Sequence, residues 1–403
     1  MNLTILLDLD DTLLSNNMET FVPHYLKALS QTINTVSPEN LAQAIMTGTQ
    51  MMIAKQEAAH TLEQVFDDYF YEAIGTSKEA TREKVDYFYE FVFPTLQTFT
   101  QARPDAVRLV QYMLTMGQRV AIATNPVFPQ AATYHRLRWA NLAPEDNSFK
   151  LISTYEDFHF TKSNPAYYAE ILAQLGWPEE PAVMIGDAWE EDIRTASMFG
   201  LPVFWVTETP GKLPEEAHPA SSQGNLSDVI PWLETITPFT YELDYSQPET
   251  LLAILRSTPA ALETITLAQP KHMWTASPSD DEWSLNEIIC HLRDVDQDVN
   301  LGRFDQITTE ENPFIVSVDS DSWNSERCYN TQDGFQALNE WFQSRTSLIK
   351  IIENLPPSVW QKTVRHTIFG PTTVAELVSF IATHDQNHIR QAFSVIRTLN
   401  LTE

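Results

Sequence analysis

Carboxylates crowd the end of the first apolar run in the chain. The stretch NLTILLDLDDT at residues 2–12 is apolar up to Leu7 and then carries Asp8, Asp10 and Asp11. Side chains alternate along a strand, so Asp8 and Asp10 are expected to point the same way. Two like charges at that spacing are costly unless a cation or a proton neutralises them. A single Asp-x-Asp is also compatible with a polar strand end that enters a turn, but three later segments favour a catalytic site.

Those three segments end in side chains that suit phosphoryl transfer: Thr124 and Asn125 in RVAIATN, Lys162 after KLIST, and Asp187 with Asp192 in GDAWEED. At one edge of a parallel sheet, where ligands bind, these side chains would meet the first carboxylates. Asp8 would attack phosphorus and form an aspartyl-phosphate, and Asp10 would protonate the leaving oxygen and later take a proton from water. Lys162 would supply positive charge and Thr124 a hydroxyl to the phosphoryl oxygens. Mg²⁺ would bind among the carboxylate and phosphate oxygens.

In this order the four segments resemble the motifs of the haloacid dehalogenase superfamily, and the resemblance covers about residues 1–235: DLDDT at 8–12, TN at 124–125, Lys162 in TKSNPAYY, and GDAWEED at 186–192. It implies that Asp8 is the nucleophile and Asp10 the acid/base, with Asn125 beside Thr124 at the substrate. It also implies a Mg²⁺ site at which Asp187 joins Asp8 and Asp10, and which Asp192 reaches directly or through water.

Position 10 separates activities within that family. The dehalogenating members lack an acid/base there, because a halide leaves without a proton. Asp10 is present in this chain. We therefore expect a Mg²⁺-dependent phosphatase acting on a small soluble phosphate ester, with a phosphomutase as an open alternative.

Histidines form a second group of candidate residues. THDQNH places His384 and His388 four residues apart, on one face of a helix. That face also carries Ile381 and Ala392, so both imidazoles are expected in the core, where an unpartnered one is costly. Together with His291 in SLNEIICHLRDVDQDV, they would form a three-nitrogen metal site with open positions. Alone, a histidine pair at this spacing also fits a structural role.

Residues 249–403 resemble the DinB-like bundle family, in which a helix that begins at Trp-Ser carries one histidine and the final helix carries His-x-x-x-His. The matching stretches are DEWSLNEIICHLRDVD and FGPTTVAELVSFIATHDQNHIRQ. The resemblance implies that His291, His384 and His388 bind a divalent metal, for which Zn²⁺, Ni²⁺ and Fe²⁺ are all suitable. His366 is interpreted as a loop histidine or a neighbour of the ligands. Some relatives use the metal for thiol-dependent transfer or isomerisation, so the bundle could be the catalytic part. Alternatively, it could only form a homodimer or sense a ligand.

The surrounding pattern predicts an α/β domain followed by an all-α domain. Strands alternate with helices from residue 104 onward, which is typical of a doubly wound parallel sheet. Residues 15–99 read as an inserted helical cap, and domain one is expected to close near residue 235. Residues 206–248 read as a turn-rich connector, with the linker at 236–248. Four helical patterns, near 249–267, 284–304, 332–354 and 372–398, then predict a four-helix bundle without a dominant strand.

Composition limits the partners and the compartment. The 403 residues carry 25 Lys+Arg against 54 Asp+Glu, a formal net charge of −29, which disfavours nucleic-acid binding. No window approaches the length of apolar sequence that a membrane span needs. Only two cysteines are present, so we expect a cytoplasmic protein. The expected partner, from the catalytic motifs, is a small-molecule phosphate.

Overall fold

The computed structural model describes residues 2–236, 245–279, 281–320 and 322–402. Most of the predicted linker at 236–248 lies outside these ranges. By its internal contacts the chain divides into two compact units. The first comprises residues 1–56, 60–171 and 178–243, and the second comprises residues 57–59, 172–177 and 244–403.

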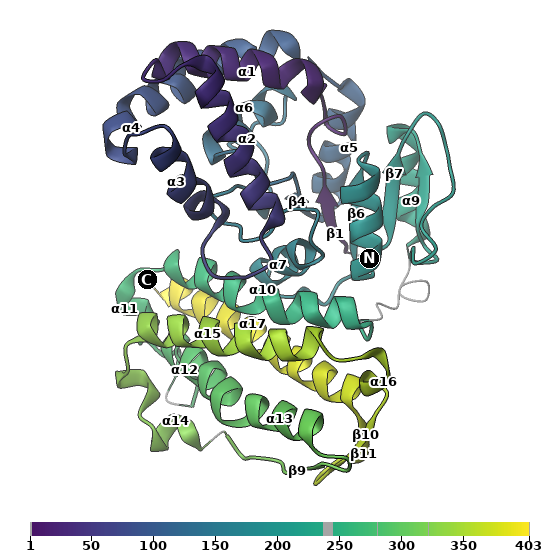
Figure 1. Cartoon of the computed structure of the whole chain (residues 1–403). Coiled ribbons are helices and arrows are strands. Elements are labelled where there is room, and N and C mark those ends of the chain that lie inside the picture. Colours follow the sequence, from purple (N-terminus) through teal and green to yellow (C-terminus); the bar gives the residue numbers. More distant parts are fainter. Residues whose placement is uncertain (1, 237–244, 280, 321, 403) are drawn as a thin grey trace. The chain divides into compact units, whose positions relative to one another are not determined.

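A six-stranded parallel sheet forms the centre of the first unit (Figure 1). Its order is β5-β4-β1-β6-β7-β8, with the bounds β1 Thr4–Leu7, β4 Arg119–Ile122, β5 Leu151–Ile152, β6 Ala182–Gly186, β7 Val203–Val206 and β8 Ser222–Gly224. The central strand β1 pairs in parallel register with β4 and β6, so that Leu6 lies opposite Ala121 and Met184. All four residues of β1 are buried, because helices cover the sheet on both faces. The predicted α/β fold of this part is confirmed.

The helices of the sheet domain follow the strands as the doubly wound pattern requires: α5 Pro104–Thr115, α6 Gln130–Trp139, α7 Ala166–Gln174, α8 Ala196–Phe199 and α9 Val229–Thr235. A π-helical turn at Trp189–Thr195 leads into α8. Helix α6 was not anticipated from the sequence. The interpretation of residues 206–248 as a turn-rich connector is wrong in part, because β8 pairs with β7 and α9 buries Val229 and Trp232 in the core.

Helices α1 to α4 form the inserted cap, a group of their own beside the sheet (Figure 1). Their bounds are α1 Met18–Ile33, α2 Pro38–Ala54, α3 Leu62–Ala73 and α4 Lys78–Tyr87, followed by helical turns at Phe88–Val92 and Phe93–Phe99. Each of the four helices begins at a side chain that accepts a hydrogen bond from its first turn: Asn17, Ser37, Thr61 and Ser77. Aromatic rings such as Phe21, Tyr25 and Phe93 pack together beneath them.

The cap is joined to the sheet domain by a short ribbon. Strand β2 (Leu14–Ser15), where the chain enters the cap, pairs antiparallel with β3 (Gln101–Ala102), where it leaves. Arg103 then donates a hydrogen bond to the backbone oxygen of Asp11 at 2.5 Å. The cap therefore starts and ends within a few residues of the first carboxylates.

The second unit is a bundle of long helices: α10 Pro248–Leu267, α12 Leu285–Val295, α13 Leu301–Thr309, α15 Gly334–Glu353 and α17 Val374–Thr402. A π-helical turn at Asp296–Asn300 joins α12 to α13. Helix α12 packs on α15, and α10 packs on both α15 and α17. Three short helices accompany them: α11 Lys271–Trp274, α14 Trp323–Glu326 and α16 Pro357–Trp360. The predicted all-α bundle is confirmed in its architecture.

The bundle also carries strands that the sequence did not reveal. A three-stranded sheet combines β9 Phe314–Ile315, β10 Thr363–His366 and β11 Gly370–Thr373. His366, interpreted as a loop histidine, is the last residue of β10, and its Nδ1 accepts hydrogen bonds from the backbone of Ile368 and Phe369. Its polar side is therefore engaged within the turn that follows the strand.

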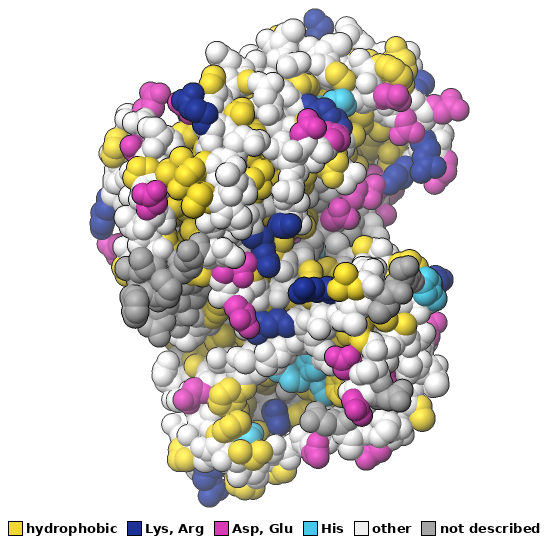
Figure 2. Space-filling view, turned by 180° about the vertical axis from the view of Figure 1, so that it is seen from behind, with side chains coloured by type: hydrophobic (Ala, Val, Ile, Leu, Met, Phe, Trp, Pro, Cys, Tyr) yellow, Lys and Arg dark blue, Asp and Glu magenta, His cyan; other side chains and the backbone are white. Residues whose placement is uncertain are grey.

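On the face shown in Figure 2, acidic and basic side chains are interspersed among polar and apolar ones. Among the described helices, none combines the length and the apolar character that crossing a membrane would take.

Candidate functional sites

The ammonium of Lys162 lies between two carboxylates in the sheet domain. Its Nζ donates to Asp8 Oδ1 at 2.5 Å and to Asp192 Oδ1 at 2.6 Å, and all three side chains are buried. Burial acts to lower the pKa of Lys162, but the charges of Asp192 and Asp8 outweigh it and raise that pKa well above its ordinary value. Lys162 is therefore a fixed cation at the carboxyl ends of β1 and β6.

Three carboxylates converge at this point. Asp8, Asp187 and Asp192 each offer an oxygen within 4.8 Å of the other two. Burial and then the charge of Asp8 raise the pKa of Asp187 to about 7, and burial raises the pKa of Asp192 well above its ordinary value. Lys162 alone does not balance three carboxylates, so this set of hard oxygen donors fits a Mg²⁺ ion.

Gly186 leaves the space that the Asp192 carboxyl group occupies beside Lys162. Gly186 ends β6, and a Cβ placed there would lie 2.2 Å from Asp192 Oδ2. The same oxygen accepts a hydrogen bond from the backbone N–H of Ala188 at 3.1 Å. Thr12 in turn donates from Oγ1 to Asp187 Oδ1 at 3.0 Å. The carboxylates are thus positioned by the loops that follow β1 and β6.

Asp10 lies outside the close group of three carboxylates and is held by other partners. Its Oδ2 pairs with the guanidinium of Arg136, and its Oδ1 accepts from Asn16 Nδ2 at 2.7 Å. Burial raises the pKa of Asp10, and the charge of Arg136 opposes that rise. Asp8 and Asp10 were expected to point the same way along one strand, and the strand placement was wrong, because β1 ends at Leu7 and both residues lie beyond it.

Asp11 shapes the turn instead of joining the site. Its backbone adopts a positive φ of 57°, and its side chain is exposed. Its Oδ1 accepts from the backbone N–H of Asn16 at 2.9 Å. The third carboxylate of DLDDT therefore stabilises the turn that leads into the cap.

Thr124 and Asn125 follow β4 and lie beside the lysine loop. Thr124 is buried, and its carbonyl oxygen accepts hydrogen bonds from Ser153 and Tyr167. Asn125 Oδ1 accepts from the backbone N–H of Lys162 at 3.3 Å, while its Nδ2 donates to Glu191 at 2.9 Å. In this geometry the Asn125 amide links the lysine loop to the loop after β6.

The three histidines of the bundle meet through one type of ring nitrogen. His384 Nε2 lies 3.2 Å from His291 Nε2 and 3.2 Å from His388 Nε2. Burial, and then the neighbouring histidines, lower the pKa of His291 to about 2, and burial lowers that of His384 to about 4. Neutral imidazole is the form that binds metal, so the cluster fits a three-nitrogen site.

A buried ion-pair network adjoins the histidine cluster. Arg345 donates to Asp296 at 2.6 Å and also pairs with Asp385, the residue after His384. Asp296 accepts a further bond from Trp341 at 3.0 Å. The ring of Trp283 stacks on that of His388, with the ring centroids 5.8 Å apart. Helix α12, which carries His291, begins at Ser284 with a capping box to Glu287.

Several residues of these sites were not identified from the sequence. Arg136 falls on the stripe of α6 that carries Ala132, Thr133 and Ala140, all of them buried, and a charged residue at such a position is a signal for a buried partner. Thr12 and Gly186 offered no comparable signal, because their roles depend on which loops meet.

Family comparisons divide the chain in the same place as its folds. Residues 3–200 match the family model described as haloacid dehalogenase-like hydrolase, and residues 253–392 match the model described as DinB superfamily. Among curated proteins, the uncharacterized protein YuaE of Bacillus subtilis (strain 168) is 25% identical over 125 residues, which cover 28% of this chain and 77% of that protein.

Two solved structures illustrate the two folds. YfiT from Bacillus subtilis, described as having an unusual four-helix bundle topology, matches with a TM-score of 0.36 and 18% identity over 40% of this chain and 91% of its own. The HAD phosphatase from Thermococcus onnurineus matches with a TM-score of 0.38 and 17% identity over 58% of this chain and 98% of its own. A 2-haloacid dehalogenase from Pseudomonas syringae also matches, with a TM-score of 0.41 and 20% identity over 58% of this chain and 99% of its own.

Proposed function

We propose that this chain is a Mg²⁺-dependent phosphatase with a metal-binding bundle appended, because residues 3–200 match the haloacid dehalogenase-like hydrolase model and residues 253–392 match the DinB superfamily model. The substrate would be a small phosphate ester. The observation that carries the proposal is Lys162, which bonds both Asp8 and Asp192 in a site where a third carboxylate, Asp187, is within reach.

Asp8 is the proposed nucleophile. Lys162 holds Oδ1, and no hydrogen bond from a described residue reaches Oδ2. This oxygen would attack phosphorus as the bond from phosphorus to the leaving oxygen breaks, which gives an aspartyl-phosphate. The fixed charge of Lys162 would stabilise the negative charge on the transferring group.

Asp10 is the proposed acid/base. It would give its proton to the leaving alkoxide in the first step. In the second step it would take a proton from water, whose oxygen attacks phosphorus as the bond to Asp8 breaks. Asn16 and Arg136 fix the carboxyl group of Asp10 for both transfers.

The carboxylates Asp8, Asp187 and Asp192 would hold Mg²⁺, which would screen the charge between the nucleophile and the phosphate. The presence of Asp10 favours ester hydrolysis over dehalogenation, because an alkoxide needs a proton and a halide does not. Thr124 would contact the phosphoryl group from the end of β4, while Asn125 would position the lysine loop and, through it, the substrate.

The test is turnover of a generic aryl phosphate and a panel of small phosphate esters with Mg²⁺ and with chelator. We expect turnover that requires Mg²⁺ and is abolished in Asp8→Asn. The matched control is Asp11→Asn, in which the side chain retains an oxygen for the turn. Turnover that survives Asp8→Asn, or that fails in both variants alike, would contradict the proposal.

For the bundle we propose a divalent transition-metal site formed by His291, His384 and His388. The specific support is the convergence of three Nε2 atoms around His384. Zn²⁺, Ni²⁺ and Fe²⁺ all suit imidazole nitrogen. Elemental analysis of natively purified protein tests the site, and an absence of stoichiometric transition metal would overturn it.

A further inference from the structure

An apolar cavity of about 410 Å³ lies inside the first unit. Cap helices α1, α2 and α3 contribute most of its wall, with side chains such as Leu29, Ile45 and Phe66. The segment that follows β4 closes it with Phe128. Its volume falls in the range of about 300–1,000 Å³ that is usual for small-molecule sites.

The cavity wall touches the residues that hold the proposed acid/base. Phe128 stacks under the guanidinium of Arg136, with 4.8 Å between the guanidinium carbon and the ring centroid. Met18 Sδ lies 3.9 Å from Asn16 Nδ2. Arg136 and Asn16 are the two side chains that bond the carboxyl group of Asp10. These contacts place part of the cavity wall next to the residues that hold the Asp10 carboxyl group.

The lining disfavours a charged leaving group. Asp67 carries the only formal charge among the described lining residues, and Lys78 pairs with it at 2.6 Å. The hydroxyl groups of Tyr25 and Tyr89 lie 3.0 Å apart and bond each other. A second phosphate or a carboxylate would lose its water here without meeting an unpaired cation.

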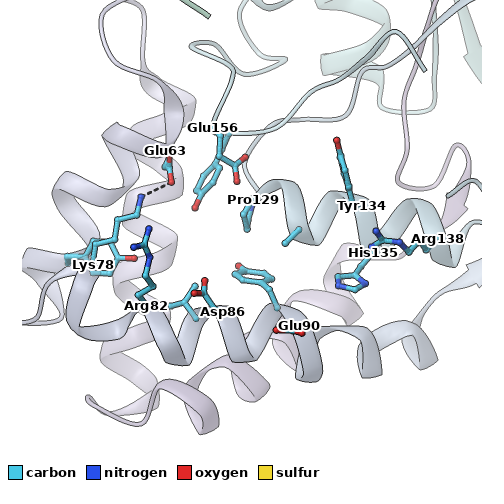
Figure 3. Close-up of a pocket in the computed structure, with 15 residues that line it drawn as sticks. Glu63, Lys78, Arg82, Asp86, Glu90, Pro129, Tyr134, His135, Arg138 and Glu156 are labelled. Atoms are coloured by element: carbon cyan, nitrogen blue, oxygen red, sulfur yellow. Dashed lines mark hydrogen bonds and ion pairs between the residues drawn. The ribbon is translucent and has the colours of Figure 1, made fainter. Parts of the chain in front are cut away.

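A second, polar cavity of about 560 Å³ shares tyrosines with the first and is lined by side chains of both charges, Arg82 among them (Figure 3). Lys78 reaches into it and bonds Glu63 at 2.7 Å. Arg138 pairs with Glu145 on the other side. Four acidic side chains line this cavity: Glu63, Asp86, Glu90 and Glu156. Its charged lining therefore distinguishes it from the apolar cavity.

We propose that the apolar cavity binds the alcohol part of the phosphate ester, and that this alcohol is apolar, with an aryl or hydrocarbon group. This inference rests on the proposed phosphatase activity and specifies its substrate class. Bisphosphates and other esters with a second anionic group are disfavoured by the same lining.

Two esters of primary alcohols test the proposal, because their leaving groups are chemically similar. We expect kcat/KM with Mg²⁺ to be about 10- to 100-fold higher for 2-phenylethyl phosphate than for glycerol 1-phosphate, as burial of a phenyl group predicts. Met46 and Met51 provide matched variants, since both are exposed on α2 but only Met46 lines the cavity. Met46→Arg should reduce the ratio of kcat/KM for 2-phenylethyl phosphate to that for glycerol 1-phosphate about tenfold, and Met51→Arg should leave this ratio unchanged.

Binding of 1-naphthol, measured by its fluorescence, tests whether the cavity accepts an aryl alcohol independently of turnover. We expect binding that Met46→Arg weakens and Met51→Arg does not. Equal turnover of the two esters, or naphthol binding indifferent to Met46→Arg, would overturn the inference while the phosphatase proposal stands. Naphthol binding that behaves as expected without hydrolysis of either ester would instead contradict the phosphatase proposal, and with it the role of the cavity as a leaving-group site.

Discussion

The guanidinium of Arg136 on α6 pairs with the carboxylate of Asp10, 126 residues earlier in the chain. The pair is nearly enclosed, with exposed side-chain fractions of 1% for Arg136 and 16% for Asp10. A charge in that position acts on the proton affinity of the proposed acid. It links the segment after β4 to the loop after β1.

Replacement of Arg136 should therefore change the pH dependence of catalysis. Burial raises the pKa of Asp10 and Arg136 lowers it, so Arg136→Gln leaves the first effect unopposed and raises the pKa further. Asp10 must carry a proton to act as an acid, so the alkaline limb of kcat/KM should move to higher pH. A pH–rate profile measures this. Arg138→Gln, an exposed position on the same helix, should leave the limb in place, and a limb that Arg136→Gln does not move would contradict the assignment of Asp10.

Gly186→Ala should damage the site through a steric effect alone. The new Cβ would collide with the Asp192 carboxyl group and displace it from Lys162. We expect a loss of about 100-fold in kcat/KM, the scale of a displacement of roughly 1 Å. Gly302→Ala is the control, because nothing lies near its Cβ position and alanine favours the helix by about 0.5–1 kcal/mol. Equal activity in the two variants would show that Asp192 tolerates displacement.

Lys162→Met should lower the unfolding free energy, because Asp8 and Asp192 then lack the cation that they share. Removal of the ammonium leaves buried carboxylates without their counterion, which costs about 3–5 kcal/mol of unfolding free energy. Mg²⁺ should restore part of this loss, so urea unfolding with and without Mg²⁺ should differ more in the variant than in the wild type. Lys150→Met, at an exposed position, should change neither value. A variant that Mg²⁺ does not stabilise would argue against a cation site at these carboxylates.

Removal of the bundle ligands should release the transition metal. His384→Ala and His388→Ala take away two of the three converging nitrogens, so metal content should fall from stoichiometric to background in elemental analysis. His366→Ala should retain the metal, because its ring bonds the turn after β10 and lies outside the histidine group. Retention of metal in His384→Ala would place the site elsewhere.

The sequence predicted those features that depend on local pattern. The apolar run before Asp8, the i, i+4 spacing of His384 and His388, and the Ser284 helix start are all readable from neighbouring residues. Both folds and the sheet edge followed from such patterns, because parallel strands bring their carboxyl ends together.

Features that depend on tertiary contact were missed. Asp8 and Asp10 were expected within the first strand, but β1 ends at Leu7, and the Arg136 partner of Asp10 comes from a helix that the sequence did not reveal. Short strands such as β8 to β11 carry weak periodicity, and partners distant in the sequence stabilise them. The apolar cavity combines side chains from the cap and from the segment after β4, which no single stretch reveals.

The central claim, that Asp8 attacks phosphorus, can be tested by trapping the intermediate. Protein mixed with excess aryl phosphate and Mg²⁺ is quenched in acid within one turnover and digested, and its peptides are weighed by mass spectrometry. The account predicts one added phosphoryl group on the peptide that contains Asp8, present in Asp11→Asn and absent in Asp8→Asn. Rapid hydrolysis with no phosphorylated peptide, or a phosphoryl group on any other residue, would contradict it.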